Sequence, residues 1–333
     1  AEYVDLHRKG VAALAEGAGA DVRVLVYSCQ PFAQCGGHGD RLNGIVTAFL
    51  LAVLTRRVFL VDSESPLPLH MFLAPRTVDW RVRGSALATA GWRQRSYHDK
   101  RRHFEADIGR LAASPDPLLV LAMNYRMLRS LFEAPELRPA AAALGLPEHV
   151  PPFFVAEVFD ALFVPSPGLR REIGRLREAL GGLEDGRFVA VHLRTGDVAW
   201  DPARHGKAEL QGFLACARQA EAELGLPGGP ETPWLLATDS AEVAEAAAAL
   251  PEALAGKLRV PGGGGRVHID RSDMGEVIEG VSANYAEWWL FGRAAAVVLS
   301  RSFFGETAAE VGRVQFAYFA PGGSCVRVDL SSS

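Results

Sequence analysis

Apolar residues along this chain fall into short runs with little polar alternation, separated by longer segments. Such runs lie at residues 22–28, 57–62, 188–191, 234–237 and 294–299. A strand that is apolar on both sides is typical of a parallel sheet whose two faces are covered by helices. The alternation of these runs with helical segments predicts an α/β fold.

The clearest helix is expected after the first run. Its apolar positions recur at spacings of three and four residues, which places them on one helix face. These positions are Ile45, Val46, Phe49, Leu50, Val53 and Leu54. Arg56 and Arg57 follow, where cations favour the negative end of a helix dipole. We expect the helix to end there and the next strand to occupy residues 57–62.

The run at residues 188–191 leads into a polar turn that contains His192, Arg194 and Asp197. Parallel sheets bind ligands at the carboxyl ends of their strands. An arginine at such an end can donate two parallel hydrogen bonds to a phosphate and stays charged at any working pH. Asp197 could orient this arginine. The alternative is an ordinary surface ion pair between Arg194 and Asp197.

Glycines lie between the first strand and the following helix, in the segment Gly36-Gly37-His38-Gly39-Asp40. Backbone N–H groups at such a turn can approach a ligand closely. Asp40 suits an N-cap, a group that faces a bound sugar or acceptor, or both. Leu42 occupies the position of the third glycine of a dinucleotide fingerprint, and the chain has no P-loop motif, so dehydrogenases and P-loop enzymes are disfavoured.

Two further apolar runs end in small polar residues. The run at 234–237 continues into Thr238, Asp239 and Ser240, and the run at 294–299 continues into the segment from Ser300 to Ala308. Hydroxyl and N–H groups at a helix start form a second cradle for an anion. It would suit the other end of a diphosphate, or a nucleoside.

In their order from residue 22 to residue 312, these segments resemble the fucosyltransferase superfamily of α1,2-, α1,6- and protein O-fucosyltransferases. The resemblance implies an α/β GT-B fold, with two Rossmann-like domains facing each other across a cleft. It implies GDP-fucose as the sugar donor and a hydroxyl of a glycan or protein as the acceptor. The implied enzyme is an inverting, metal-independent glycosyltransferase.

The resemblance also implies roles for individual residues. Arg194 would contact the β-phosphate and assist the departure of GDP, His192 would lie along the nucleotide or ribose, and Asp239 would contact the nucleoside. Ser302 and Phe303 would hold phosphate and base. The expected donor-binding set is Gly37, His38, Gly39, Asp40, His192, Arg194, Asp197, Asp239, Ser300, Ser302 and Phe303. The alternative for His192 and Phe303 is a place in the core.

A general base is harder to locate than the arginine. Asp40, Asp201 and Glu306 are candidates because each lies in or just beyond one of the motif loops. The α1,6-fucosyltransferases carry a carboxylate shortly after their arginine motif, and Asp201 lies near that place without aligning cleanly. A loose transition state, in which the leaving group has mostly departed, would reduce the demand on a base.

Composition fits two globular domains. The chain has 333 residues, of which 49% are hydrophobic and 22% charged, enough for two separate cores. A charged helical segment at residues 168–186 marks the junction. We expect an N-terminal domain at 1–165 on the acceptor side and a C-terminal domain at 166–333 that binds the nucleotide sugar. The formal charge of −4 argues against nucleic acid as a partner.

No cofactor is expected beyond GDP-fucose as co-substrate. The chain lacks the Asp-x-Asp with which other transferases hold a metal, and its nine histidines form no metal-site motif. No stretch is long and apolar enough for a membrane span. The four cysteines leave the compartment open, although Cys29 and Cys35 could form a local bridge. We expect a Golgi or ER lumenal domain, separated from its anchor, in a eukaryote and a cytoplasmic enzyme in a bacterium.

Two other functions remain possible at this point. One is a glycosyltransferase of the same architecture with another donor, such as GDP-arabinose, GDP-mannose or a UDP-sugar. The other is a carbohydrate- or nucleotide-binding protein that has kept the scaffold and lost turnover. Arg194 argues against the second, because holding a buried arginine without its anion would cost stability.

Overall fold

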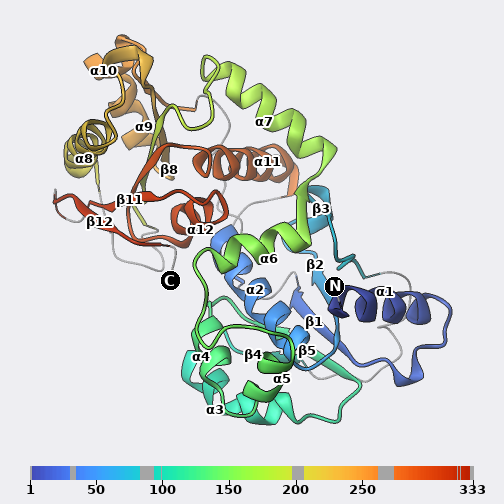
Figure 1. Cartoon of the computed structure of the whole chain (residues 1–333). Helices are drawn as coiled ribbons and strands as arrows, with labels where there is room; N and C mark the ends of the chain where they lie inside the picture. The colour runs from blue at the N-terminus through green and yellow to red at the C-terminus, as the bar shows by residue number, and fades with distance from the viewer. Residues whose placement is uncertain are drawn as a thin grey trace. The chain divides into compact units, whose positions relative to one another are not determined.

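The computed structural model describes residues 2–30, 35–82, 94–98, 100–196, 206–261, 274–320, 322 and 324–330. The chain divides into two compact units, Ala1–Ser166 and Pro167–Ser333, and each has a sheet of its own (Figure 1). This division falls one residue after the boundary expected from the sequence.

The N-terminal unit is built on a four-stranded sheet of order β2-β1-β5-β4, in which every pair is parallel. Its strands are β1 (Val24–Cys29), β2 (Val58–Ser63), β4 (Gln94–Ser96) and β5 (Leu118–Ala122). All six residues of the central strand β1 are buried, as its apolar pattern predicts. The short strands β3 (Leu73–Pro75) and β6 (Phe163–Pro165) form a separate antiparallel pair.

The N-terminal unit also contains helices. The helices are α1 (Glu2–Ala15), α2 (His38–Leu54), α3 (Arg101–Ala112), α4 (Leu128–Glu133), α5 (Arg138–Ala143) and α6 (Phe154–Leu162). The helix α2 packs against β1 and β2, and it approaches the sheet closely because residue 44 is a glycine. A Cβ atom on Gly44 would lie 2.1 Å from the carbonyl oxygen of Met123 and 2.8 Å from the ring of Tyr27.

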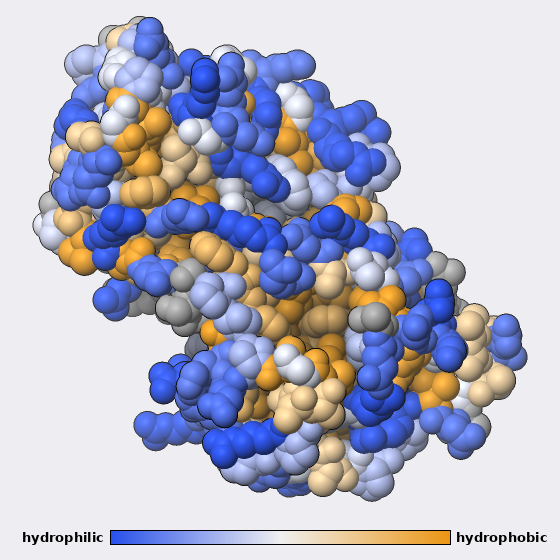
Figure 2. Space-filling view, in the orientation of Figure 1, coloured by the Kyte–Doolittle hydropathy of each residue, from blue (hydrophilic) through white to orange (hydrophobic). Residues whose placement is uncertain are grey.

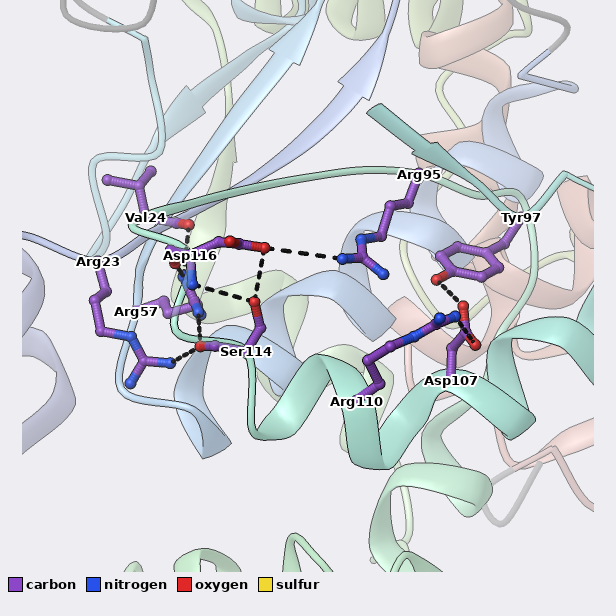
Figure 3. Close-up of polar contacts among 9 residues, drawn as sticks. All are labelled: Arg23, Val24, Arg57, Arg95, Tyr97, Asp107, Arg110, Ser114 and Asp116. Atoms are coloured by element: carbon purple, nitrogen blue, oxygen red, sulfur yellow. Dashed lines mark hydrogen bonds and ion pairs between the residues drawn. The ribbon is translucent and has the colours of Figure 1, made fainter. Parts of the chain in front are cut away.

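Arg57 differs from the sequence expectation. Arg57 was expected to close the helix and to interact with the negative end of its dipole. In the structure α2 ends at Leu54, and Arg57 is fully buried. Its guanidinium donates to the carbonyl oxygens of Ser114 (2.8 Å) and Asp116 (2.7 Å), as Figure 3 shows. Burial lowers the pKa of Arg57 to about 10. Arg57 therefore ties the start of β2 to the segment before β5, because buried carbonyls must find donors.

The C-terminal unit contains a six-stranded sheet of order β12-β11-β10-β7-β8-β9. All pairs are parallel except that of β11 with β12. The strands are β7 (Val189–Leu193), β8 (Trp234–Thr238), β9 (Leu258–Arg259), β10 (Ala296–Leu299), β11 (Phe316–Phe319) and β12 (Val326–Val328). From one edge, their order along the chain is third, second, first, fourth, fifth, sixth. This is the order of a Rossmann sheet, and it reverses between β7 and β10.

The helices of this unit are α7 (Pro167–Ala179), α8 (Leu210–Glu223), α9 (Ala241–Ala248), α10 (Pro251–Leu254), α11 (Met274–Phe291) and α12 (Phe303–Val311). In Figure 1, α7 and α11 lie side by side, in agreement with their contacts. Short 3-10 helices occur in the two units at Gly19–Asp21, Leu69–Met71, Lys207–Glu209 and Gly229–Glu231.

Close packing of α11 against α12 depends on two glycines. A Cβ atom on Gly312, just after α12, would lie 1.8 Å from the carbonyl oxygen of Gly292, just after α11. Such an approach is closed to any residue with a side chain. The end of α12 is thereby fixed against α11, which sets the direction in which α12 leaves the sheet.

Few large apolar side chains are exposed among the described residues. On the face drawn in Figure 2, hydrophilic residues predominate on each unit. Three large apolar side chains are exposed among the described residues, namely Met71, Ile278 and Val326. Scattered exposures of this kind are normal for a folded protein. In the part of the chain that the structure describes, no helix has the length and apolar character needed to cross a membrane.

All four cysteines are paired. Cys29 at the end of β1 is bonded to Cys35, just before the glycine segment, so the local bridge considered from the sequence is present. Cys216 on α8 is bonded to Cys325, next to β12, across a separation of 109 residues. This second pair joins α8 to the segment just before β12, and nothing in the sequence pointed to it.

The long-range disulfide should contribute most to stability. Because a cross-link that closes a loop of this length removes much entropy from the unfolded chain, a C216A/C325A variant should lose about 3–5 kcal/mol of unfolding free energy. A C29A/C35A variant should lose less, about 2 kcal/mol, because its loop is short. Urea unfolding of both variants and the parent, without reductant, would measure this. A larger loss from the short-range pair would contradict the expectation.

Candidate active site

The loops after β7 and β10 meet at the point where the strand order of the C-terminal sheet reverses. His192 on β7 lies opposite Leu299 on β10, and the Ser300 N–H donates to the His192 carbonyl oxygen (2.9 Å), which extends the pairing by one residue. Arg194 and Ser300 therefore emerge side by side. In open α/β sheets, ligands bind at such a reversal, outside the carboxyl ends of the strands.

The turn that carries Arg194 is held by residues from both neighbouring strands. Its backbone N–H donates to Ser300 Oγ (2.9 Å), beyond β10. The Thr195 N–H donates to Asp239 Oδ1 (2.8 Å), beyond β8, and Thr195 Oγ1 donates to the same oxygen (3.0 Å). Gly196 follows with a φ of 89°, a conformation that favours glycine. The turn is thus held in place by the Thr195 hydroxyl and by the side chains of Ser300 and Asp239.

The guanidinium of Arg194 forms an ion pair with Asp239. The two side chains are 23% and 24% exposed, so solvent or a ligand can reach the pair. An arginine has five N–H donors in a planar fork, and it can bind an anion while it contacts one carboxylate. The structure brings Arg194, Asp239 and Ser300 together, three of the residues named from the sequence.

His192 lies beneath this turn. It is buried, with 5% of its surface exposed, and its Nδ1 atom is 3.3 Å from Ser300 Oγ. Its ring stacks on Phe304, with 5.2 Å between ring centroids, and meets the edge of Phe291. Packing of this kind fixes the ring, and through Ser300 it supports the backbone of Arg194.

The start of α12 forms the other side of the site. Ser302 is the N-cap, and its hydroxyl accepts from the Phe304 N–H (3.4 Å). The Glu306 carboxylate accepts from the Ser302 N–H (3.1 Å). Phe303 is the first helical residue and is partly buried. A helix N-terminus carries partial positive charge and attracts anions, but two N–H groups at this one already donate to Ser302 Oγ and to Glu306.

The glycine segment starts α2 in the N-terminal unit. Gly36 has a φ of 75°, and Gly37 is the N-cap. Asp40 was expected as a possible N-cap, but it lies three residues after the N-cap. Its carboxylate accepts a hydrogen bond from the Gly37 N–H (2.9 Å). His38 and Gly39 are the first helical residues and are buried. Burial, with the charge of Arg41, lowers the pKa of His38 to about 3, so the ring is neutral at physiological pH.

Sequence reasoning missed several residues that build these loops. Arg41 is almost fully buried, donates from Nε to the Gly36 carbonyl oxygen (2.9 Å) and also contacts the Ser65 carbonyl oxygen. It joins the glycine turn to the loop after β2. Thr195 was missed as well. Its place between Arg194 and Gly196 was a usable signal, because threonine side chains often order turns.

Two of the predicted site residues, Asp197 and Asp201, lie outside the described residues. Within the described part of the chain, no three His, Cys, Asp or Glu side chains gather as they would around a metal ion.

The approach of α12 to the end of β7 requires a glycine at position 305. A Cβ atom there would lie 2.7 Å from Leu299 Cδ2 and 3.2 Å from His192 Nδ1, both in the core. We expect Gly305→Ala to lower the unfolding free energy by about 1–3 kcal/mol. Gly174→Ala is the matched control, because no atom lies within 4 Å of its Cβ position on α7. Denaturant unfolding measures the stability of both variants. A Gly305→Ala variant as stable as the Gly174→Ala variant would contradict this packing argument.

Comparison with known proteins identifies the fold. The sequence matches no protein-family model, and a comparison with curated proteins found no match. A mutant FUT1 of Arabidopsis thaliana, solved with GDP, is 16% identical with a TM-score of 0.67, over 99% of this chain and 82% of its own. The α-1,6-fucosyltransferase NodZ, soaked with GDP-fucose, is 14% identical with a TM-score of 0.55, over 92% of this chain and 99% of its own. NodZ from Bradyrhizobium gives 15% identity and the same TM-score and coverage. The predicted fold class is confirmed: this chain has the α/β fold of the GT-B fucosyltransferases.

Proposed function

We propose that this protein is a glycosyltransferase that moves fucose from GDP-fucose to a hydroxyl of a glycan or protein acceptor. The observation that carries the proposal is the ordered Arg194, at the strand-order reversal and beside the start of α12. An arginine and a helix N-terminus together suit a diphosphate. The solved structures that share the fold include a FUT1 with GDP and a NodZ soaked with GDP-fucose.

In the proposed reaction, the bond between the sugar carbon and the diphosphate oxygen breaks as the acceptor oxygen attacks from the opposite face. The electron pair of the broken bond remains on the β-phosphate of GDP, and the Arg194 guanidinium stabilises the charge that develops there. A donor fixed in advance at such a position is worth several kcal/mol of barrier, roughly 3–4 for a single hydrogen bond. Inversion at the sugar carbon follows from attack on the face opposite the leaving group.

The acceptor proton must leave to a base. Asp40 and Glu306 remain the proposed carboxylates within the described residues, and Asp201 is the third candidate. The first two already accept a hydrogen bond from the backbone at a helix start, and hydrogen bonding to a carboxylate reduces its basicity. We therefore assign most of the rate acceleration to departure of the leaving group.

Arg194 and the helix start would also supply the positive charge that a metal provides in other transferases. We propose that the reaction is metal-independent and that chelation with EDTA leaves its rate unchanged. In the proposed division of labour, the C-terminal unit binds the nucleotide sugar and the N-terminal unit, with the glycine segment, binds the acceptor.

The two disulfides support a proposal on compartment. Disulfides persist in oxidising environments and are rare in the cytosol. Both cysteine pairs are bonded here, which favours the Golgi or ER lumen in a eukaryotic cell over the cytoplasm.

Nucleotide binding tests the donor directly. We expect calorimetry without added metal to show binding of GDP and GDP-fucose and much weaker binding of UDP. Preference for UDP or for GDP-mannose would assign another donor to the same fold. Absence of all nucleotide binding would point to a non-catalytic relative.

Replacing Arg194 tests the mechanism. Because the leaving-group charge would lose its counterion, we expect Arg194→Ala to lower kcat about 10²–10³-fold. The melting temperature should change little, because the side chain is partly exposed. Arg187→Ala is the matched control: Arg187 lies just before β7, at the opposite end of the same strand, and is 77% exposed. Near-normal turnover of the Arg194 variant would defeat the mechanism.

A further inference from the structure

The carboxylate of Asp239 makes a set of contacts that differs from the role implied by family resemblance. The resemblance assigns Asp239 to the nucleoside. In the structure, Oδ2 accepts from the Arg194 guanidinium, and Oδ1 accepts from both the N–H and the hydroxyl of Thr195. Both carboxylate oxygens therefore serve the turn that carries Arg194.

The position of Asp239 is itself rigid. Leu193 on β7 pairs with Thr238 on β8, so Asp239 starts level with Arg194 on the neighbouring strand. Thr238 Oγ1 accepts from the Ser240 N–H (3.3 Å), and Ser240 Oγ then caps α9 by accepting from the Val243 N–H (3.2 Å). Asp239 is thus held between a strand end and a capped helix, and cannot move without disturbing one of them.

We propose that Asp239 is a positioning residue that holds the plane of the Arg194 guanidinium and the backbone of its turn for the transition state. This inference rests on the proposed function and deepens it. When a carboxylate holds one N–H group of a guanidinium, the other N–H groups stay available for the diphosphate. The orientation of the guanidinium is then set before GDP-fucose binds. Residues that lock a reactive group in place matter because a misplacement of about 1 Å can cost about 10² in rate.

Asp239→Asn is the most selective change. Asparagine keeps a carbonyl oxygen for Thr195, but its amide NH₂ cannot accept from Arg194. We expect kcat to fall about 10²-fold, while the affinity for GDP changes no more than about threefold, as for an interaction that acts mainly in the transition state. Glu242→Gln is the matched control, because it also removes one negative charge but at an exposed position on α9. It should leave kcat and the affinity for GDP at the parent values.

A double-mutant cycle separates positioning from direct contact. In an Arg194→Ala background there is no guanidinium to hold, so adding Asp239→Asn should change the residual rate less than about twofold. If Asp239 instead contacts the nucleoside, the two effects would multiply. Asp239→Asn would also alter the preference for GDP over inosine diphosphate, which lacks the 2-amino group of guanine. Either result would overturn the proposal.

A measurement on the side chain itself does not depend on activity. In ¹⁵N NMR spectra, the Nε–H resonance of Arg194, assigned from Arg194→Lys, should be sharp in the parent and broadened or shifted in Asp239→Asn.

Should circular dichroism show that Asp239→Asn fails to fold, Thr195→Val replaces it. That variant removes one of the contacts to Oδ1 and should lower kcat about fivefold to tenfold. An unchanged Arg194 resonance in Asp239→Asn, or an unchanged kcat in Thr195→Val, would refute the positioning role. Failure of the proposed function would look different: the parent protein would bind no GDP, while the NMR result would still report on Asp239.

Discussion

The parallel pairing of β7 with β10 is the constraint on which the candidate site depends. These strands lie far apart along the chain, since the contact between Arg194 and Ser300 joins residues 106 positions apart. All nine residues of the two strands are buried, and eight of them are apolar, with His192 the exception. Burial of these strands stabilises the pairing, and the pairing then places one polar loop next to another. The chemistry of the site is a consequence of how the core is assembled.

Close helix packing gives this site its fixed geometry. Gly305 lets the start of α12 lie against His192, and Gly292 and Gly312 let the other end of α12 lie against α11. The helix is thereby held at both ends, and its N-terminus cannot turn away from the strand ends. In the N-terminal unit, Gly44 plays a corresponding part for α2. Close-packed interiors move little, so groups anchored in this way are ordered before any ligand arrives.

Many polar groups at the site are satisfied within the protein. The N–H groups of Arg194 and Thr195 donate to Ser300 and Asp239, and the carboxylates of Asp40 and Glu306 accept from helix starts. Groups that could have bound a ligand directly instead hold the loops in place. Under the proposed function, the partly exposed Arg194 guanidinium would be the main group left to bind a diphosphate.

The sequence by itself determined the elements and the chemistry of their ends. The apolar runs predicted β1, β2, β7, β8 and β10, and the periodic pattern predicted α2, because strand and helix preferences depend on neighbours a few residues away. It also marked Arg194 and the segment from Ser300 as strand-end residues. The tertiary structure alone decided that Asp239 pairs with Arg194, that Arg57 is buried among the carbonyls before β5, and that Cys216 bonds to Cys325. Each of these contacts joins residues that are distant in sequence, so it follows from the order of strands in a sheet, which no local pattern specifies.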